Sequence, residues 1–442
     1  MKKNNILSCL SLVDNRIILK KQNYQLTIKD LISLSGSRYI DQIRGKKVAI
    51  DQNDFDKAIL IALADGVVDE LYILPQGYLK NNSKFLKKYN IDEVLNCQKL
   101  QPIEPNSFPF EEILSNYNIE TKWILQTSGT SGNPKQVQHN FSSISSSVKF
   151  SKTMNNQLTW GSTYSLDRFA GTQVFLQALL GGGTILFPQS KALGGVIDEF
   201  IDGKVDSISA TPTLWRKILM QKNSINLNLS NITLGGEIAD QNILNSLLKA
   251  FPDSRIRHIF ASTESGASIT VEDCLEGFPS TLIDSMENNY SLTVSKKGTL
   301  MVKASGMSQG YIDENKEFKS KNGYYDTGDL IELRGKRYHF LGRESGIINI
   351  GGTKIIPEEV EKKILTFPGV IDVLVYGRKN SIIGNLLACD LVVDKAVVKD
   401  TNLFLDSLKK YYKENNNDIS CPRMYKIVDE ISTSNAGKAI RR

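Results

Sequence analysis

The chain has 442 residues, which is more than one average domain holds and enough for two or three. Hydrophobic residues make up 40% and charged residues 23% of it, as in an ordinary globular protein. The 54 basic and 48 acidic residues leave a net charge of +6, a mild excess that gives no reason to expect a nucleic-acid partner. No apolar run is long enough to cross a bilayer, so we expect no membrane span.

The cysteines and the N-terminus bear on the cellular compartment. The cysteines are widely spaced and odd in number, and no pair has the spacing of metal ligands: Cys9, Cys97, Cys274, Cys389 and Cys421. We therefore expect reduced thiols rather than a disulfide framework. The apolar segment after the basic N-terminus is too short for a signal peptide. Together these features predict a cytoplasmic protein.

The first part of the chain alternates between strand-like and helix-like segments. Residues 46–50 and 70–75 have the pattern of buried strands, and residues 54–64 between them have apolar residues at helical spacing. This alternation predicts an α/β layer with parallel strands. The polar residues 81–118 predict a surface connection with short helices, and residues 123–126 predict a strand that ends at a glycine-rich loop.

A second alternating stretch follows that loop. Strands are predicted at residues 173–176, 184–187, 207–210 and 231–234, separated by helix-length spans. From residue 292 to 341 the pattern changes to short strands and turns, which predicts a small β subdomain.

After Gly342 the chain has the pattern of a separate unit of common domain size. Strands are predicted at residues 373–376 and 386–388, and a polar helix at 404–414. The expected fold class is therefore α/β, with a large N-terminal domain of layered α/β subdomains and a small β subdomain, followed by a smaller α+β domain.

The glycine-rich loop has the composition of a phosphate-binding loop. Such a loop needs bare backbone N–H groups, small residues, hydroxyl donors and a cation, and here it lies between a predicted strand and a predicted helix near residues 142–147. These groups come from Thr127, Ser128, Gly129, Thr130, Ser131, Gly132 and Lys135. The Gly-Lys-Ser/Thr ending of kinase and GTPase loops is missing. By composition alone the segment is equally compatible with a flexible surface turn.

Five further motifs follow the loop. They are Gly235-Gly236-Glu237, Phe260-Ala261-Ser262-Thr263-Glu264, Tyr325-Asp326-Thr327-Gly328-Asp329, the segment 342–361, and Asn435-Ala436-Gly437-Lys438-Ala439-Ile440-Arg441. In this combination and order, the sequence resembles the acyl-adenylate-forming (AMP-binding) enzyme superfamily, which includes acyl-CoA synthetases, peptide-synthetase adenylation domains and luciferases. The resemblance runs from about Tyr24 to the C-terminus, and it implies that the loop binds the phosphates of ATP.

The resemblance also implies a role for each of the later motifs. At adenine, the backbone of Gly235, Gly236 and Glu237 would line the base and Phe260 would stack on it. Thr263 would contact the α-phosphate, and Glu264 would hold Mg²⁺. Asp329 and Arg343 would bind the ribose. Lys438 would offset charge at the reacting oxygens. Phe260 and Ala261 replace the Tyr and Gly that are commoner in the family.

The segment 342–361 matches the family's connection between two domains. The resemblance implies a nucleotide- and acyl-binding domain at residues 1–344, a mobile cap at residues 345–442, and a hinge near Ser345, where the family usually has Asp or Lys. Gly352 matches the glycine that lets the backbone approach pantetheine.

The implied reaction is ligation in two steps. A small carboxylic acid would react with MgATP to give acyl-adenylate and pyrophosphate, with Lys438, Glu264 and Thr263 as catalytic residues. The acyl group would then pass to the thiol of coenzyme A or, as the alternative, to the phosphopantetheine of a carrier protein. Two other interpretations remain. One is a family member that binds nucleotide without catalysis, and the intact motifs argue against it. The other is a nucleic-acid- or membrane-surface protein, and the lack of clustered basic and aromatic residues argues against that.

The acid itself is weakly encoded. The expected acyl-pocket segments are residues 164–173, 209–215 and 235–237. In amino-acid-activating members an Asp near the first segment binds the α-amine; here Phe169 falls close to that position and Asp167 lies two residues earlier. This favours an acid without an α-amine, although a shift of two residues would restore the Asp.

Overall fold

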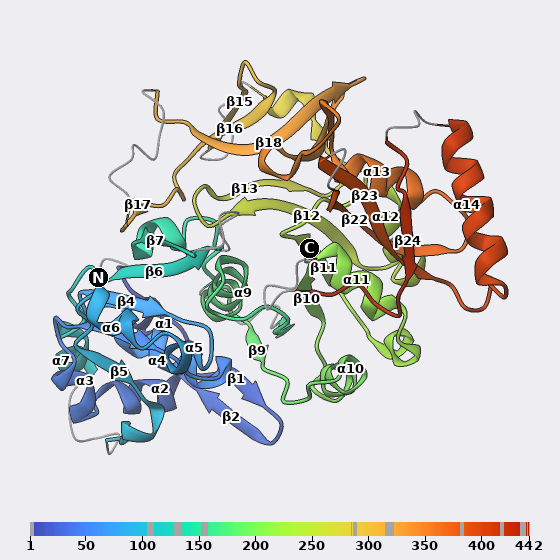
Figure 1. The fold of residues 1–442 in the computed structure, drawn as a ribbon. Coiled ribbons are helices and arrows are strands. Elements are labelled where there is room, and N and C mark those ends of the chain that lie inside the picture. The colour runs from blue at the N-terminus through green and yellow to red at the C-terminus, as the bar shows by residue number, and fades with distance from the viewer. Residues whose placement is uncertain are drawn as a thin grey trace.

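The structure is a computed structural model that describes residues 4–103, 110–127, 134–151, 158–283, 285, 290–313, 322–380, 384–415, 420–433, 439 and 441. It has a large N-terminal domain built on three sheets and a small C-terminal domain, drawn in orange to red in Figure 1. The mixed α/β fold class predicted from the sequence is confirmed. No helix in these ranges is long and apolar enough to span a membrane.

The first sheet has six strands in the order β17-β7-β6-β4-β3-β5. Their bounds are β3 (Lys47–Ile50), β4 (Glu70–Ile73), β5 (Glu93–Leu95), β6 (Lys122–Thr127), β7 (Lys135–His139) and β17 (Gly310–Tyr311). The strands from β6 to β5 are parallel, whereas β7 runs antiparallel to β6 and β17 antiparallel to β7. Helix α4 (Asp54–Ala64) connects β3 to β4 and begins where the Asn53 side chain accepts a hydrogen bond from the Asp56 N–H.

Short elements complete this part of the chain. They are α1 (Ile6–Leu10), α2 (Ile28–Ser35), α3 (Arg38–Gln42), α5 (Tyr78–Asn81), α6 (Lys84–Lys88), η1 (Cys97–Lys99), α7 (Phe110–Ser115) and α8 (Phe141–Ile144). The predicted surface connection 81–118 does contain short helices, and it also supplies the edge strand β5, whose Leu95 is buried.

The second sheet has eight strands in the order β13-β12-β11-β10-β8-β9-β1-β2. Their bounds are β1 (Ile17–Lys21), β2 (Tyr24–Thr27), β8 (Thr159–Gly161), β9 (Thr184–Leu186), β10 (Ser207–Ala210), β11 (Asn231–Gly235), β12 (Arg255–Ser262) and β13 (Gly266–Val271). The helices between its strands are α9 (Phe169–Leu180), α10 (Leu193–Asp202), α11 (Pro212–Leu219), η2 (Lys222–Asn226) and α12 (Gln241–Ala250).

These helices cover both faces of the second sheet. The step from β8 to β9 goes one way across the sheet, and the steps from β9 to β10 and from β10 to β11 go the other way. Right-handed crossovers then place α9 on one face and α10, α11 and α12 on the other. The hydrophobic cores are consistent with this placement of the helices. Helix α9 packs in one apolar cluster with α1 and α4, and α10 to α12 pack in a second cluster.

The third sheet is antiparallel and has the order β14-β19-β18-β16-β15. Its elements are β14 (Phe278–Pro279), η3 (Ser280–Leu282), β15 (Tyr290–Val294), β16 (Thr299–Ala304), β18 (Tyr325–Arg334) and β19 (Arg337–Arg343). This is the small β subdomain that the sequence predicted, and in Figure 1 it lies above the first two sheets.

The last part of the chain follows β19. It contains η4 (Glu344–Gly346), β20 (Ile348–Ile350), β21 (Thr353–Ile355), α13 (Pro357–Ile364), β22 (Val370–Asn380), β23 (Gly384–Val393), α14 (Thr401–Asn415) and β24 (Met424–Ile427). Its three-stranded sheet, in the order β22-β23-β24, lies beside α11 of the large domain (Figure 1). The predicted boundary near Ser345 falls in the short turn η4.

Two predicted elements were wrong. Residues 173–176 belong to helix α9, where Phe175 and Leu176 are fully buried; a short apolar run in a buried helix cannot be told from a strand by its period. The glycine-rich loop is followed by strand β7 rather than by a helix, because Val137 continues the pairing with β6. The helix expected near residues 142–147 is reduced to the single turn of α8.

Candidate active site

The two ends of the predicted phosphate loop meet in the first sheet. Thr127 is the last residue of β6, Lys135 is the first of β7, and the two are paired across the hairpin. Ser128, Gly129, Thr130, Ser131 and Gly132 lie outside the described residues. Because a strand follows the loop, its phosphate-binding N–H groups would come from the loop backbone and not from a helix N-terminus.

Strands β11 and β12 place two further motifs at their carboxyl ends. They are parallel neighbours in which Gly235 pairs with Ile259, so the segment 235–237 lies next to the start of the segment 260–264. Ligands of open α/β sheets bind at this edge. Thr263 and Glu264 occupy the turn between β12 and β13.

Tyr311 connects the phosphate loop to the predicted metal ligand. Its hydroxyl donates a hydrogen bond to Oε1 of Glu264 at 3.0 Å, and Nζ of Lys135 lies 4.6 Å from the centre of its ring. Burial first, and the Glu264 carboxylate second, raise the pKa of Tyr311 above its usual value, so its hydroxyl keeps its proton at neutral pH. Tyr311 was not predicted from the sequence, because only the pairing of β17 with β7 brings it here.

The two predicted ribose ligands are neighbours on β18 and β19. Asp329 pairs with Arg343 in the sheet, and Nε of Arg343 donates a hydrogen bond to Oδ1 of Asp329 at 2.9 Å. Tyr325, at the start of β18, has its pKa raised by burial and then by the Glu264 carboxylate, so it lies within electrostatic reach of the predicted metal ligand. The third sheet thus brings the two predicted ribose ligands to the side of Glu264.

Phe260 and Thr263 are fixed by aromatic neighbours. The ring of Phe260 stacks on that of Phe340 from β19, with centroids 4.9 Å apart and planes 14° apart. Nε2 of His139 lies 2.7 Å from the carbonyl oxygen of Thr263. Burial lowers the pKa of His139 to about 4, so the ring is neutral at pH 7, and with its proton on Nε2 it donates to that carbonyl. His139 is a second residue that sequence reasoning missed.

The segment 235–237 joins two other parts of the site. The Tyr164 hydroxyl donates to the Gly235 carbonyl at 3.1 Å. The Glu237 carboxylate accepts hydrogen bonds from the backbone N–H of Thr213, at 3.0 Å, and of Ala439, at 2.9 Å. Thr163, the residue before the first predicted acyl-pocket segment, also bonds to the Ser209 carbonyl. With the bonds of Tyr164 and Glu237, this places the three predicted segments against one another.

The C-terminal end of the chain enters the site at Ala439. Lys438, the residue before it, lies outside the described residues. Arg441 is bound within the small domain, where its Nη2 donates to Glu358 at 2.9 Å and to Glu361 at 3.0 Å. Burial raises the pKa of Glu361 to about 7, and Arg441 opposes that shift.

Asp167, the acidic residue near the predicted amine position, is buried and paired with two cations. Its carboxylate lies 3.5 Å from Nζ of Lys57, which is fully buried on α4, and 3.1 Å from Nε of Arg168. Phe169, two residues later, begins α9 and stacks on His139 with ring centroids 5.6 Å apart. Phe169, and not Asp167, therefore faces the residues around Thr263.

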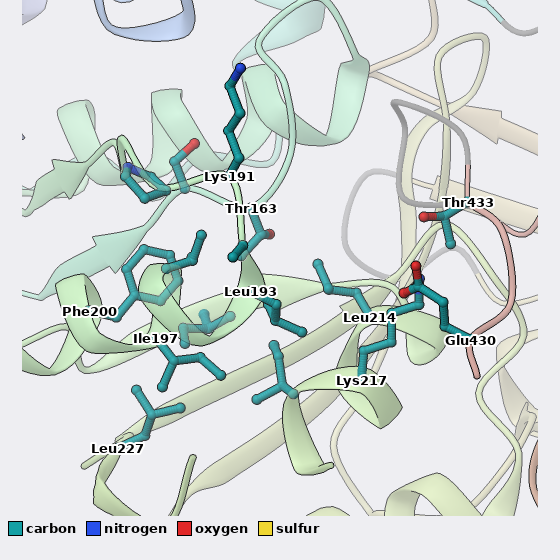
Figure 2. A pocket seen from close by; sticks show the side chains of 16 residues that line it. Thr163, Lys191, Leu193, Ile197, Phe200, Leu214, Lys217, Leu227, Glu430 and Thr433 are labelled. Atoms are coloured by element: carbon teal, nitrogen blue, oxygen red, sulfur yellow. The ribbon is translucent and has the colours of Figure 1, made fainter. Parts of the chain in front are cut away.

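A cavity of about 480 Å³ adjoins the site on the α10 and α11 side of the second sheet. Figure 2 shows apolar side chains gathered on one side of it, among them Leu193, Ile197 and Phe200, with Glu430 and Thr433 of the small domain on the other. Of the predicted acyl-pocket segments, only Leu214 lines this cavity.

Glu264 is chemically suited to Mg²⁺, which prefers carboxylate oxygen. No group of three or more His, Cys, Asp and Glu side chains placed to hold a metal ion occurs in the part of the chain that the structure describes. A magnesium ion at Glu264 would take its remaining ligands from phosphate oxygens and water. None of the five cysteines, all of which lie in the described residues, forms a disulfide.

The fold and this site define a two-domain, nucleotide-dependent enzyme. Residues 115–312 match the family model of the AMP-binding enzymes, and residues 359–438 match that of the AMP-binding enzyme C-terminal domain. The chain belongs to the AMP-binding enzyme family, as its motifs predicted.

Relatives and solved structures agree with this assignment. The 2-succinylbenzoate–CoA ligase of Bacillus subtilis (strain 168) is 25% identical over 406 residues, which are 87% of this chain and 82% of that protein. The o-succinylbenzoate CoA synthetase of Bacillus subtilis, solved with an acyl-adenylate, has a TM-score of 0.72 at 20% identity, over 99% of this chain and 97% of that one. ATP-bound MatB from Rhodopseudomonas palustris has a TM-score of 0.75 at 16% identity, with the same coverage of both chains. The predicted class of an ATP-dependent, AMP-forming acid–thiol ligase is confirmed.

Proposed function

We propose that this ligase joins a small carboxylic acid without an α-amine to the thiol of coenzyme A, through an acyl-adenylate. The observation that carries the proposal is the continuous array from Lys135 through Tyr311 to Glu264, with Asp329 and Arg343 beside it. It supplies a cation for phosphate, a carboxylate for a metal ion and a polar pair for ribose, in the order of these groups in MgATP.

In the first half-reaction, a carboxylate oxygen of the acid attacks the α-phosphorus of ATP, the bond to the bridging oxygen breaks, and pyrophosphate leaves. Lys135 and the loop hydroxyls hold the leaving phosphates, and Thr263 contacts the α-phosphate. Glu264 holds Mg²⁺, which neutralises phosphate charge when bound. Positioning and charge stabilisation supply the catalysis, without a protein nucleophile.

Lys438 adds charge compensation at the reacting oxygens in this step. In the second half-reaction the cap turns about a hinge near Ser345 and withdraws Lys438. The thiol sulfur then attacks the acyl carbon, AMP leaves, and the thiol proton passes to solvent. The hinge, the limits of the two domains and a cytoplasmic location are part of the same proposal.

The absence of an α-amine is inferred from the pairing of Asp167. An ammonium ligand needs an anionic partner, and the Asp167 carboxylate already serves Lys57 and Arg168. Phe169 instead presents an aromatic ring to the Thr263 side of the site. An acid with an apolar or aromatic body fits this neighbourhood better than an amino acid does.

The test is the exchange of labelled pyrophosphate into ATP with a panel of acids. The panel holds 2-succinylbenzoate, simple aliphatic and aromatic acids, and the common amino acids. We expect exchange with one or more of the non-amino acids, and consumption of coenzyme A with the same acids. Exchange with amino acids alone would contradict the proposed acid class, and transfer to a phosphopantetheinylated carrier protein without consumption of coenzyme A would contradict the acceptor.

A further inference from the structure

We propose that Glu237 is a positioning residue for the first half-reaction, because its carboxylate fixes the chain at Ala439, the residue after Lys438. This inference rests on the proposed function and deepens it. The resemblance gave this segment a role only through its backbone, along adenine. The structure shows a separate contact of the Glu237 side chain.

Each oxygen of the Glu237 carboxylate serves a different domain. Oε2 accepts the Thr213 N–H at 3.0 Å, in the first turn of α11, and Oε1 accepts the Ala439 N–H at 2.9 Å. The first bond satisfies a helix N–H that has no partner within the helix, and the positive end of the helix favours the carboxylate. The side chain is therefore held by the large domain before it receives the small one.

The C-terminal segment is bound to the small domain at Ala439 itself and at Arg441. Ala439 forms an antiparallel bridge with Thr433, and Arg441 is paired with Glu358 and Glu361. Residues 439 and 441 must therefore move with the small domain. The bond between Glu237 and Ala439 can form only when the two domains have the relative orientation of this structure.

Between residues that the structure describes, two other polar contacts join the domains near this point. Lys217 lies 3.0 Å from Glu430, whose side chain is 70% exposed, so this pair contributes little. Arg216, paired with Asp240, lies 3.8 Å from Asp372 of the small domain and offsets the negative charge around Glu237. Neither contact involves the segment next to Lys438, so Glu237 alone among these residues acts on it.

Two substitutions separate the bonds of Glu237. Glu237→Gln keeps the shape but leaves one acceptor oxygen for two N–H donors, and Glu237→Ala removes both bonds. Glu430→Gln is the matched control, because it also removes one interdomain carboxylate but does not touch residue 439. Folding of each variant is checked by its thermal unfolding midpoint.

The first readout is kinetic. We expect Glu237→Gln to lower the maximal rate of pyrophosphate exchange about 10-fold, and Glu237→Ala to lower it further, because a hydrogen bond to a charged group is lost. The KM for ATP should change less than about 3-fold, since positioning affects the transition state more than ground-state binding. Consumption of separately prepared acyl-adenylate by coenzyme A should fall by less than the exchange rate does.

The second readout is hydrogen–deuterium exchange of the C-terminal peptide, which needs no acid substrate. Glu237→Ala should speed exchange of the Ala439 amide, and Glu430→Gln should leave it unchanged. Unchanged Ala439 exchange, or a rise in KM with a normal maximal rate, would overturn the positioning role. If wild-type protein exchanges no pyrophosphate with any acid, the proposed function fails, and the amide measurement still decides whether Glu237 holds Ala439.

Discussion

The Tyr311 hydroxyl provides a sharp test of the array around the predicted metal ligand. In Tyr311→Phe the ring stays under Lys135, while the hydroxyl loses its hydrogen bond to Glu264, 3.0 Å long, and its contact with Tyr325. A hydrogen bond to a charged group contributes about 1.5–3 kcal/mol. Both side chains are half-buried, so the lower end applies. That corresponds to a rate about 10-fold lower.

Tyr311→Leu removes the ring as well. The cation–π contact with Lys135 contributes about 0.5–1 kcal/mol, which adds a factor of about 2–5. The assay is the initial rate of pyrophosphate exchange at increasing MgCl2, because a Glu264 carboxylate that is less well oriented should need more Mg²⁺ for half-maximal rate. Tyr324→Phe is the control, since its hydroxyl bonds to Ser291 and its ring lies 5.9 Å from Lys303. A Tyr311→Phe enzyme with the wild-type rate and Mg²⁺ dependence would refute the reasoning.

Three further outcomes are expected. Lys57→Met should lower the free energy of unfolding by about 3 kcal/mol in urea titrations, because it removes a fully buried ammonium from two carboxylate partners. Lys47→Met, at a surface pair, should lower it by less than about 1 kcal/mol. Equal losses in the two variants would contradict a stabilising role for the buried Lys57 pairs. Burial raises the pKa of Asp65 and of Glu361 to about 7, so the folded state binds more protons than the unfolded state and stability falls as pH rises towards 8. The thermal unfolding midpoint should therefore be higher at pH 6.5 than at pH 8. A midpoint that rises with pH would count against the raised pKa values of Asp65 and Glu361. Lys438→Ala should suppress acyl-adenylate formation while ATP still binds, and a wild-type exchange rate would remove Lys438 from the mechanism.

The sequence by itself determined the family, the fold class and most strands. The short apolar runs at residues 47–50 and 231–235 are bounded by turns and buried on both faces. Their composition therefore predicted strands and no other element. Residues 173–176 were misread, because an apolar run inside a helix has no polar face to reveal its period. The motif residues were found through the fixed order of short polar segments, which survives where overall identity is low.

Only the tertiary structure decided which groups meet. Tyr311 contacts Glu264, and His139 contacts Thr263, through pairings between strands that are far apart in the chain, which no local pattern encodes. The pairing of Asp167 with Lys57 likewise depends on how α4 packs against the loop before α9. The second role of Glu237 appears only where two domains meet, because a hydrogen bond to a backbone N–H leaves no trace in the identity of the residue that donates it.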